Sequence, residues 1–205
     1  MPYIVNNQVV GHDPREIERK PSYVEFFEKI GNSVDNIQVI PNFLSEEEIA
    51  YLLTHIDERR RNSFVSQKDN DGNPTAWIHN YECIVDSHDI QNRIKKEVIK
   101  KFGNENIKAM AGPNNYLNIA RWDKGTKLTL HVDDLGYVAE NHLPTLVYLN
   151  DDYEGGEISF ATHPVTIKPK TGDLIMFPGN LHYAHEVKEV LSGTRYTLPI
   201  WFTVL

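Results

Sequence analysis

A histidine and an aspartate two positions apart, His131 and Asp133, stand near the end of the run LTLHVDD at residues 128–134. The run alternates apolar and polar side chains, which predicts a β-strand. Successive side chains of a strand point to opposite faces, so residues two apart emerge on the same face. An imidazole and a carboxylate placed in this way can converge on one metal ion, and this pair is our first candidate for a metal site.

The same H-x-D triplet occurs again at His55 and Asp57, within a stretch whose apolar residues recur at helical spacing. On a helix, side chains two residues apart are separated by about 200° of rotation around the helix axis, so they cannot coordinate the same ion. The predicted local structure therefore separates the two triplets, and only His131 and Asp133 remain as candidate ligands.

A third ligand is required, because two protein ligands hold a catalytic metal weakly. Two histidines and one carboxylate form the facial triad of non-haem iron sites, which leaves positions open for substrate and oxygen. The downstream candidates are His163, His182 and His185. His163 precedes a proline in a predicted turn, where a histidine is usually solvated. His182 and His185 both follow FPGNL, and residue chemistry alone leaves both of them open.

An arginine, Arg195, lies in the last predicted strand, TRYTLPIWFTV at residues 194–204. It falls on the face opposite the apolar residues Tyr196, Leu198, Ile200 and Phe202. A buried guanidinium is costly without an anionic partner. That partner can be an internal Asp or Glu, or a carboxylate ligand that the planar fork binds through two hydrogen bonds. The strand pattern alone leaves both readings open.

The elements that must position these side chains are mostly short strands. From about residue 116 onward, β-branched and aromatic runs alternate with Gly, Asp, Asn and Pro, which is typical of an all-β sandwich or a small barrel. Upstream, a strand is predicted at residues 37–40, and a capping box of Ser45 and Glu48 opens a helix that should run to about Arg60. A second helix should begin at Ser87, with one buried face made of Ile90, Ile94, Val98 and Phe102.

Residues 62–77, NSFVSQKDNDGNPTAW, are polar and rich in Asn, Asp and Gly, which predicts a long loop, and long loops in compact domains often contact ligands. Residues 1–36 lack a sustained period and are interpreted as an N-terminal extension, followed by one domain at residues 37–205. The predicted class is mainly β with supporting helices (α+β).

Charge and composition restrict the binding partners and the cellular location that we expect for this chain. Twenty-one basic and 29 acidic residues give a net charge of −8, which disfavours nucleic acid as a partner. The single cysteine, Cys83, cannot form an internal disulfide. No apolar run approaches the roughly 20 residues of a membrane span, and no leader pattern is visible, so we expect no membrane partner and a cytoplasmic location.

With these residues identified, the sequence from about Ile37 to Leu205 resembles the Fe(II)- and 2-oxoglutarate-dependent dioxygenases, specifically the prolyl 4-hydroxylase-like branch. The segments that carry the resemblance are VIPNFLSEEEIAYLL, YLNDDYEGGEISF, IKPKTGDLIMFPGNLHYAHEV and SGTRYTLPIWF. In that family the distal histidine is followed about ten residues later by the basic residue of a G-x-R/K motif. Arg195 follows His185 at this spacing, so the resemblance selects His185 over His182 as the third ligand.

The resemblance implies a double-stranded β-helix, a cupin-like jelly-roll whose open mouth holds the metal. It also implies that residues 62–77 correspond to the region that covers the substrate in peptide-binding relatives, as a candidate lid. It implies Fe(II) at His131, Asp133 and His185, with 2-oxoglutarate and O2 as co-substrates and ascorbate as an optional further cofactor. Arg195 would bind the distal carboxylate of 2-oxoglutarate. Tyr148, in VYLN, matches a tyrosine that donates to the same carboxylate in some relatives, and the role of an ordinary core aromatic is equally compatible with it.

One position departs from the family pattern, because RWDKG carries Trp122 where relatives commonly have a tyrosine. The implied reaction is hydroxylation of an unactivated carbon, in first place on a prolyl residue of a peptide or protein, with decarboxylation of 2-oxoglutarate to succinate. A free amino acid or a small metabolite is the alternative substrate.

Three other functions remain as rivals. A cupin-like metal enzyme without 2-oxoglutarate leaves Arg195 without a role, and a non-catalytic β-sandwich binding module would not bind iron stoichiometrically. A nucleobase-demethylating oxygenase is disfavoured by the acidic charge and by the absence of a second arginine shortly after Arg195. The sequence does not specify the oligomeric state.

Overall fold

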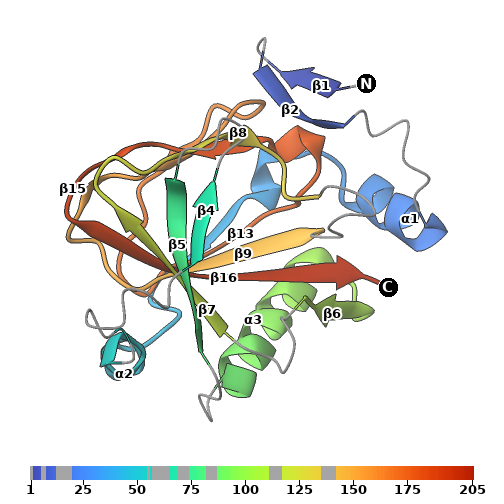
Figure 1. Ribbon diagram of the computed structural model, residues 1–205. Helices are drawn as coiled ribbons and strands as arrows, with labels where there is room; N and C mark the ends of the chain where they lie inside the picture. Colours follow the sequence, from blue (N-terminus) through green and yellow to red (C-terminus); the bar gives the residue numbers. More distant parts are fainter. Residues whose placement is uncertain are drawn as a thin grey trace.

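The computed structural model describes residues 2–5, 8–12, 20–54, 56, 65–68, 74–81, 87–110, 117–134 and 142–205. Antiparallel strands make up most of the regular structure in these residues, with three α-helices beside them, which confirms the predicted mainly-β class. Figure 1 shows the long final strand running through the centre of the sheet, with a helix lying across it.

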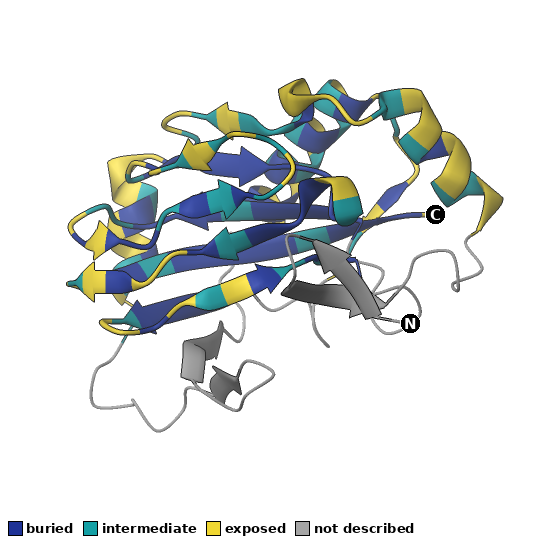
Figure 2. Cartoon of the chain, turned by 90° about the horizontal axis from the view of Figure 1, so that it is seen from above, coloured by how far each residue is buried: buried dark blue, intermediate teal, exposed yellow. Residues whose placement is uncertain are grey.

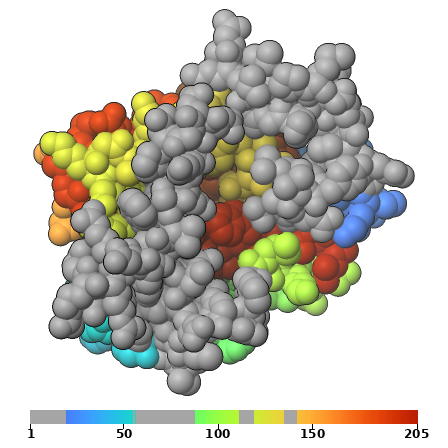
Figure 3. Space-filling model, viewed as in Figure 1, coloured from blue at the N-terminus to red at the C-terminus, as the bar shows by residue number. Residues whose placement is uncertain are grey.

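The larger sheet has eight strands in the order β3-β13-β9-β16-β7-β5-β4, with β6 pairing to β16 beside this path. Figure 3 shows the C-terminal residues, coloured red, next to the green segment that contains β6. The strand bounds along the chain are β3 (Gln38–Ile40), β4 (Val65–Lys68), β5 (Pro74–Tyr81), β6 (Ile107–Ala109), β7 (Leu117–Asp123), β9 (Leu143–Tyr148), β13 (Leu174–Met176) and β16 (Thr194–Val204).

A smaller sheet of four strands, in the order β12-β11-β14-β8, faces the larger one. Its strands are β8 (Leu128–His131), β11 (Ile158–Phe160), β12 (Thr166–Ile167) and β14 (His185–Val187). Two further pairs join β1 (Pro2–Val5) to β2 (Gln8–His12) and β10 (Glu154–Gly155) to β15 (Val190–Ser192). The facing sheets form the sandwich that the spacing of short strands predicted.

Alternation along the strands of the larger sheet produces two cores, because successive side chains point to opposite faces. In β9, Val147 joins the cluster on the helix side of the sheet, whereas Tyr148 joins the cluster that contains Ile158 and Phe160 of the smaller sheet. In β13, Ile175 likewise lies on the side of the smaller sheet. Figure 2 shows that the central strands are mostly buried and that many exposed residues lie on helices and loops.

The helices cover the outer face of the larger sheet. They are α1 (Pro21–Ile30), α2 (Glu46–Thr54) and α3 (Ser87–Phe102), with short 3-10 helices at η2 (Val34–Asn36) and η4 (Leu181–Tyr183). The predicted face of α3 is buried at each of its four positions, Ile90, Ile94, Val98 and Phe102. Those side chains pack in one cluster with Leu198, Ile200 and Phe202 of β16.

The start of α2 follows the predicted capping box, but its end does not follow the prediction. Ser45 N donates to Glu48 Oε2 at 2.9 Å, and Glu48 N donates to Ser45 Oγ at 3.2 Å. The helix ends at Thr54 rather than near Arg60. Ile56 N donates to the carbonyl of Leu53, three residues back, so the chain has left the α-helical hydrogen-bond pattern at this point.

The prediction of a long loop at residues 62–77 is wrong, because two strands occupy much of it. Val65–Lys68 forms β4 and Pro74–Tyr81 forms β5, and the two pair as an antiparallel ribbon. β5 also pairs with β7 over five positions, from Trp77 with Arg121 to Tyr81 with Leu117. Tertiary pairing with the sheet therefore overrides the loop-like composition. The second H-x-D triplet, His55 and Asp57, lies outside the described residues.

Residues of the predicted N-terminal extension pack against the domain. Phe26 of α1 is buried in the same cluster as α3 and β16. The boundary between residues 36 and 37 stays a prediction. In the part of the chain that the structure describes, no helix is both long and apolar enough to cross a membrane.

Candidate active site

Three candidate metal ligands converge at the smaller sheet. β8 and β14 pair so that His131 lies directly opposite His185, with ring centroids 4.3 Å apart. Asp133 follows β8, and its Oδ2 lies 3.5 Å from His185 Nε2. One ligand atom from each residue lies within 4.8 Å of the other two. The arrangement has the composition of the two-histidine, one-carboxylate triad that binds non-haem Fe(II).

The backbone determines which nitrogen of each imidazole is available. His131 Nδ1 lies 2.8 Å from the carbonyl oxygen of Thr129, and His185 Nδ1 lies 3.1 Å from that of Tyr183. A carbonyl only accepts hydrogen bonds, so each Nδ1 carries the proton and each Nε2 presents a lone pair. Hydrogen bonds of this kind orient metal-ligating histidines.

His185 is buried, and its charge state suits a metal ligand. Burial lowers the pKa of His185 to about 4, and the nearby His131 acts in the same direction, whereas Asp133 opposes the shift. The ring is therefore neutral at neutral pH, which is the form that coordinates a metal.

The carboxylate of Asp133 is oriented by an indole from the opposite sheet. Trp201 Nε1, on β16, donates to Asp133 Oδ1 at 3.1 Å. The other oxygen, Oδ2, is the one that faces His185. One oxygen is thus held by a hydrogen bond while the other remains directed toward the two histidines.

Arg195, on β16, is fully buried and has no carboxylate partner among the described residues. Its Nη2 donates to Tyr148 Oη at 2.9 Å, and its Cζ lies 4.7 Å from the ring centroid of Trp122. Its Nε and Nη1 have no hydrogen-bond partner within this part of the chain. An internal ion pair therefore does not explain the buried guanidinium here, and its unpaired N–H groups suit an anionic ligand.

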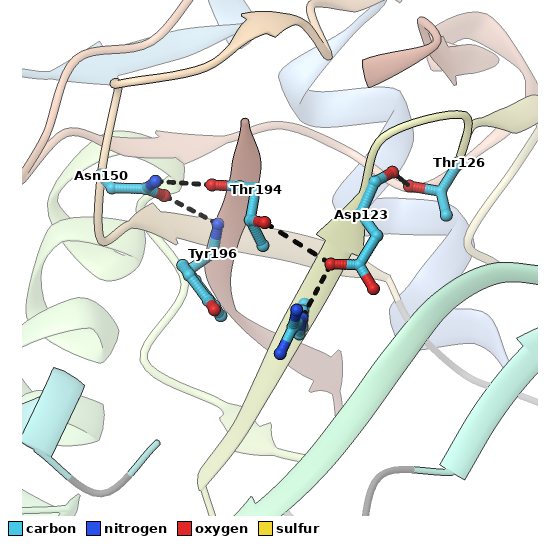
Figure 4. Close-up of polar contacts among 6 residues, drawn as sticks. Asp123, Thr126, Asn150, Thr194 and Tyr196 are labelled. Atoms are coloured by element: carbon cyan, nitrogen blue, oxygen red, sulfur yellow. Dashed lines mark hydrogen bonds and ion pairs between the residues drawn. The ribbon is translucent and has the colours of Figure 1, made fainter. Parts of the chain in front are cut away.

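The backbone on both sides of Arg195 is bonded by side chains at the ends of the two neighbouring strands, Asn150 just after β9 and Asp123 at the end of β7 (Figure 4). Asn150 Nδ2 donates to the carbonyl of Thr194 at 2.7 Å, and Asn150 Oδ1 accepts from the N–H of Tyr196 at 2.7 Å. Asp123 Oδ1 lies 3.5 Å from the Thr194 hydroxyl. Since β9 ends at Tyr148, the Asn150 amide supplies hydrogen bonds that the strand no longer supplies to this end of β16.

The structure separates the histidines that residue chemistry left open. His182 lies in η4 and is exposed, and it does not belong to the triad. His163 stacks near Tyr183, with ring centroids 5.0 Å apart. Among the predicted residues, His131, Asp133 and His185 come together, and Tyr148 lies against Arg195.

Three residues near the site were not singled out as functional from the sequence: Trp201, Asn150 and Tyr153. Trp201 shares a strand face with Arg195, which was a usable signal, but its partner Asp133 is 68 positions away. Asn150 and Tyr153 lie in YLNDDYEGG, which carried part of the family resemblance without indicating a role for either residue.

Comparison with known proteins agrees with this geometry. Residues 117–203 match the family model described as the 2OG-Fe(II) oxygenase superfamily. Among curated proteins, human prolyl 3-hydroxylase 2 is 42% identical over 64 residues, which cover 29% of this chain and 9% of that protein. The chain thus spans about a tenth of the length of the first prolyl 3-hydroxylases it matches.

Solved structures share the fold over most of the chain. A Pseudomonas putida prolyl-4-hydroxylase superposes with a TM-score of 0.65 at 15% identity, covering 89% of this chain and 99% of that one. A Trichoplax adhaerens prolyl hydroxylase, in complex with a peptide fragment of the hypoxia inducible factor oxygen degradation domain, gives 0.64 at 17% identity, covering 91% and 94%. These likenesses establish the predicted double-stranded β-helix.

Proposed function

Because residues 117–203 match the family model of the 2OG-Fe(II) oxygenase superfamily, we propose that the chain is an Fe(II)- and 2-oxoglutarate-dependent dioxygenase that hydroxylates a prolyl residue of a peptide or protein. One observation carries the proposal: the described chain combines a two-histidine, one-carboxylate triad with a fully buried arginine that lacks a carboxylate partner there.

His131, Asp133 and His185 are the proposed Fe(II) ligands. The donor set fits the ion, since it combines two neutral imidazoles with one carboxylate and leaves further coordination positions for a co-substrate and oxygen. The contacts of the two Nδ1 atoms with backbone carbonyls direct the Nε2 atoms toward the site. Trp201 holds Asp133 so that its Oδ2 remains available.

Arg195 and Tyr148 are the proposed partners of the distal carboxylate of 2-oxoglutarate. The unpaired Nε and Nη1 of Arg195 fit such a group, because a carboxylate supplies the acceptors that these N–H groups lack. Tyr148 Oη accepts from Arg195 and still has its own hydroxyl proton to donate. The ring of Trp122 covers the guanidinium and excludes water from it.

When bound, iron and 2-oxoglutarate supply the oxidising chemistry, in which O2 is consumed, 2-oxoglutarate becomes succinate and carbon dioxide, and a substrate carbon receives a hydroxyl group. The chain's own residues bind and orient these groups and keep water away from them.

Prolyl residues are the proposed substrate on the strength of the relatives. The curated matches include prolyl 3-hydroxylases, and one solved structure of a prolyl hydroxylase holds a peptide. The matches include prolyl 3-hydroxylases as well as a prolyl-4-hydroxylase, so the proposal leaves the ring position to be measured. A peptide, rather than nucleic acid, also suits a chain with net charge −8.

Anaerobic titration tests the cofactor assignment. Apo protein is titrated with Fe(II) and then with 2-oxoglutarate, and the visible charge-transfer band of the chelate is recorded. We expect a band in the wild type, no band in His185→Ala, and a far higher 2-oxoglutarate requirement in Arg195→Ala. His182→Ala is the matched control, because His182 is exposed and outside the triad.

Two results would contradict the proposal in different ways. If the wild type bound iron but showed no band, the assignment of 2-oxoglutarate as co-substrate would be wrong and the cupin-like alternative would be favoured. If the wild type did not bind iron, the proposed metal site would be wrong.

The substrate is tested separately by mass spectrometry of proline-containing peptide libraries incubated with the loaded enzyme. A gain of one oxygen on proline, dependent on 2-oxoglutarate, supports the proposal, and fragment analysis or chromatography of hydroxyproline isomers gives the position. Hydroxylation of free amino acids but not of peptides would replace the peptide assignment with the small-molecule alternative.

A further inference from the structure

A second phenol lies at the buried guanidinium, and neither the sequence nor the family resemblance gave it a role. Tyr153 follows β9 in the segment YLNDDYEGG and is 4% exposed. Its hydroxyl has no hydrogen-bond partner among the described residues, although the guanidinium of Arg195 lies beside it. A buried, unsatisfied hydroxyl costs free energy, so its position calls for an explanation.

The backbone is shaped to place Tyr153 at this point. Gly156 has a φ of +68°, and a Cβ at this position would lie 3.0 Å from Arg195 Cδ and 3.1 Å from Tyr153 Cε2. Gly193, with a φ of +75°, would place a Cβ 3.0 Å from Tyr153 Cα. Both glycines therefore permit the close approach of Tyr153 to Arg195. The backbone at these two glycines, and not only the rotamer of Tyr153, therefore determines that Tyr153 lies close to Arg195.

The neighbouring groups offer the Tyr153 hydroxyl no hydrogen-bond acceptor among the described residues. A guanidinium has N–H donors and no acceptor, so it cannot receive the proton of the Tyr153 hydroxyl. Burial raises the pKa of Tyr153 to about 12, and the charge of Arg195 only partly offsets this, so the phenol is a neutral donor at physiological pH. Tyr153 Oη, Arg195 Nε and Arg195 Nη1 are thus neighbouring donor groups without acceptors in this part of the chain.

We propose that Tyr153 donates a hydrogen bond to the distal carboxylate of the co-substrate, together with Arg195 and Tyr148, and so contributes to the selection of a dicarboxylate over a monocarboxylate keto acid. The inference rests on the proposed function. A carboxylate offers about four lone-pair directions, which is enough to satisfy this cluster. Tyr153 thereby adds a neutral donor to a site whose positive charge comes from one arginine.

The test compares 2-oxoglutarate with 2-oxobutanoate, a keto acid that lacks the distal carboxylate. Fe(II)-loaded wild type and Tyr153→Phe are titrated anaerobically with each ligand, and dissociation constants are read from the charge-transfer band. Tyr153→Phe keeps the ring and removes one hydrogen bond to a charged group, so 2-oxoglutarate should bind about tenfold more weakly. Binding of 2-oxobutanoate should not change.

A surface substitution, Tyr51→Phe, is the matched control and should leave both constants unchanged, because Tyr51 is 44% exposed. Unchanged 2-oxoglutarate binding in Tyr153→Phe, or equal weakening of both ligands, would overturn the assignment of Tyr153 while the wild-type band still supported the proposed function. A wild type without any band would overturn both.

Discussion

The indole of Trp201 reaches across from β16 to Asp133, and within the described part of the chain this hydrogen bond orients the carboxylate of the triad. Trp201→Phe should weaken Fe(II) binding about tenfold, since partners that orient metal ligands typically contribute 10- to 100-fold in affinity. Anaerobic calorimetric titration with Fe(II) measures the change. Trp122→Phe is the matched control, because Trp122 packs on Arg195. Equal weakening by both substitutions would assign the loss to general disruption of the core.

The raised pKa of Tyr153 predicts that the folded protein loses stability at alkaline pH. Its pKa is raised to about 12 in the folded protein, against an ordinary value of 10.0. Between these values the unfolded chain has lost the proton and the folded chain has kept it, so the free energy of unfolding falls as pH rises. At pH 11 the wild type should lose about 1 kcal/mol that Tyr153→Phe does not lose. Urea unfolding at pH 9 and pH 11 checks the difference, and identical losses in both proteins would contradict it.

At the level of single residues, the sequence was sufficient where chemistry and local geometry coincide. His131 and Asp133 could be paired because a strand places alternate side chains on one face. The choice of His185 needed the family resemblance, since residue chemistry left His182 open. The roles argued for Trp201 and Tyr153 depend on residues that lie many positions away in sequence, and strand periodicity does not specify which distant side chains meet.

Among the elements, the first residues of β16 make two hydrogen bonds with the side chain of Asn150, beside the backbone bond from Leu149 N to the carbonyl of Tyr196. Asn150→Ala should destabilise the protein by about 1–3 kcal/mol, because it leaves a partly buried carbonyl and N–H unpaired. It should also raise the dissociation constant of 2-oxoglutarate, since Arg195 lies between the two bonded residues. Urea unfolding and the anaerobic titration measure the two effects.

Ser192→Ala serves as the control for this substitution. Ser192 Oγ bonds Glu154 at 3.1 Å on the exposed side of the same region, so its loss should change the free energy of unfolding by less than about 0.5 kcal/mol. If both substitutions changed the free energy of unfolding equally, the two hydrogen bonds of Asn150 would not be a particular source of stability for β16.

Periodicity predicted the elements whose burial is set within one segment, such as the apolar face of α3 and the strands after residue 116. It did not predict β4, whose residues lie within the polar stretch 62–77. The strand conformation of β4 comes from pairing with β5, which in turn pairs with β7 about 40 residues later in the chain. Periodicity also predicted the end of α2 too late in the chain, because Ile56 continues the apolar pattern after the helical hydrogen bonds have ended.

Across the whole molecule, residues 20–36 contact the neighbours of two candidate ligands. Tyr23 Oη donates to Asp134 Oδ2 at 2.7 Å, next to Asp133 in sequence. Asn36 Nδ2 donates to Tyr183 Oη at 2.9 Å, and the carbonyl of Tyr183 accepts from His185. The segment interpreted as an N-terminal extension therefore bonds to neighbours of two candidate ligands, which its lack of periodicity could not reveal.

Tyr23→Phe should test this support. Loss of a hydrogen bond to a partly buried carboxylate should lower the free energy of unfolding by about 1–2 kcal/mol and weaken Fe(II) binding measurably. Guanidinium unfolding and Fe(II) titration are the two measurements. Val24→Ala is the control, since Val24 is an exposed residue of the same helix. Unchanged iron affinity in a destabilised Tyr23→Phe would limit the segment to a role in folding.

The candidate ligands and the buried arginine belong to different sheets: His131 and His185 lie in the smaller sheet, and Arg195 lies in the larger one. A molecule bound at once to the metal and to Arg195 would link the local opening of one sheet to that of the other, because either opening would require its release. Amide hydrogen exchange in β8 and β14 and at the start of β16 should then slow together when iron and co-substrate are both present. Iron alone should protect mainly the smaller sheet.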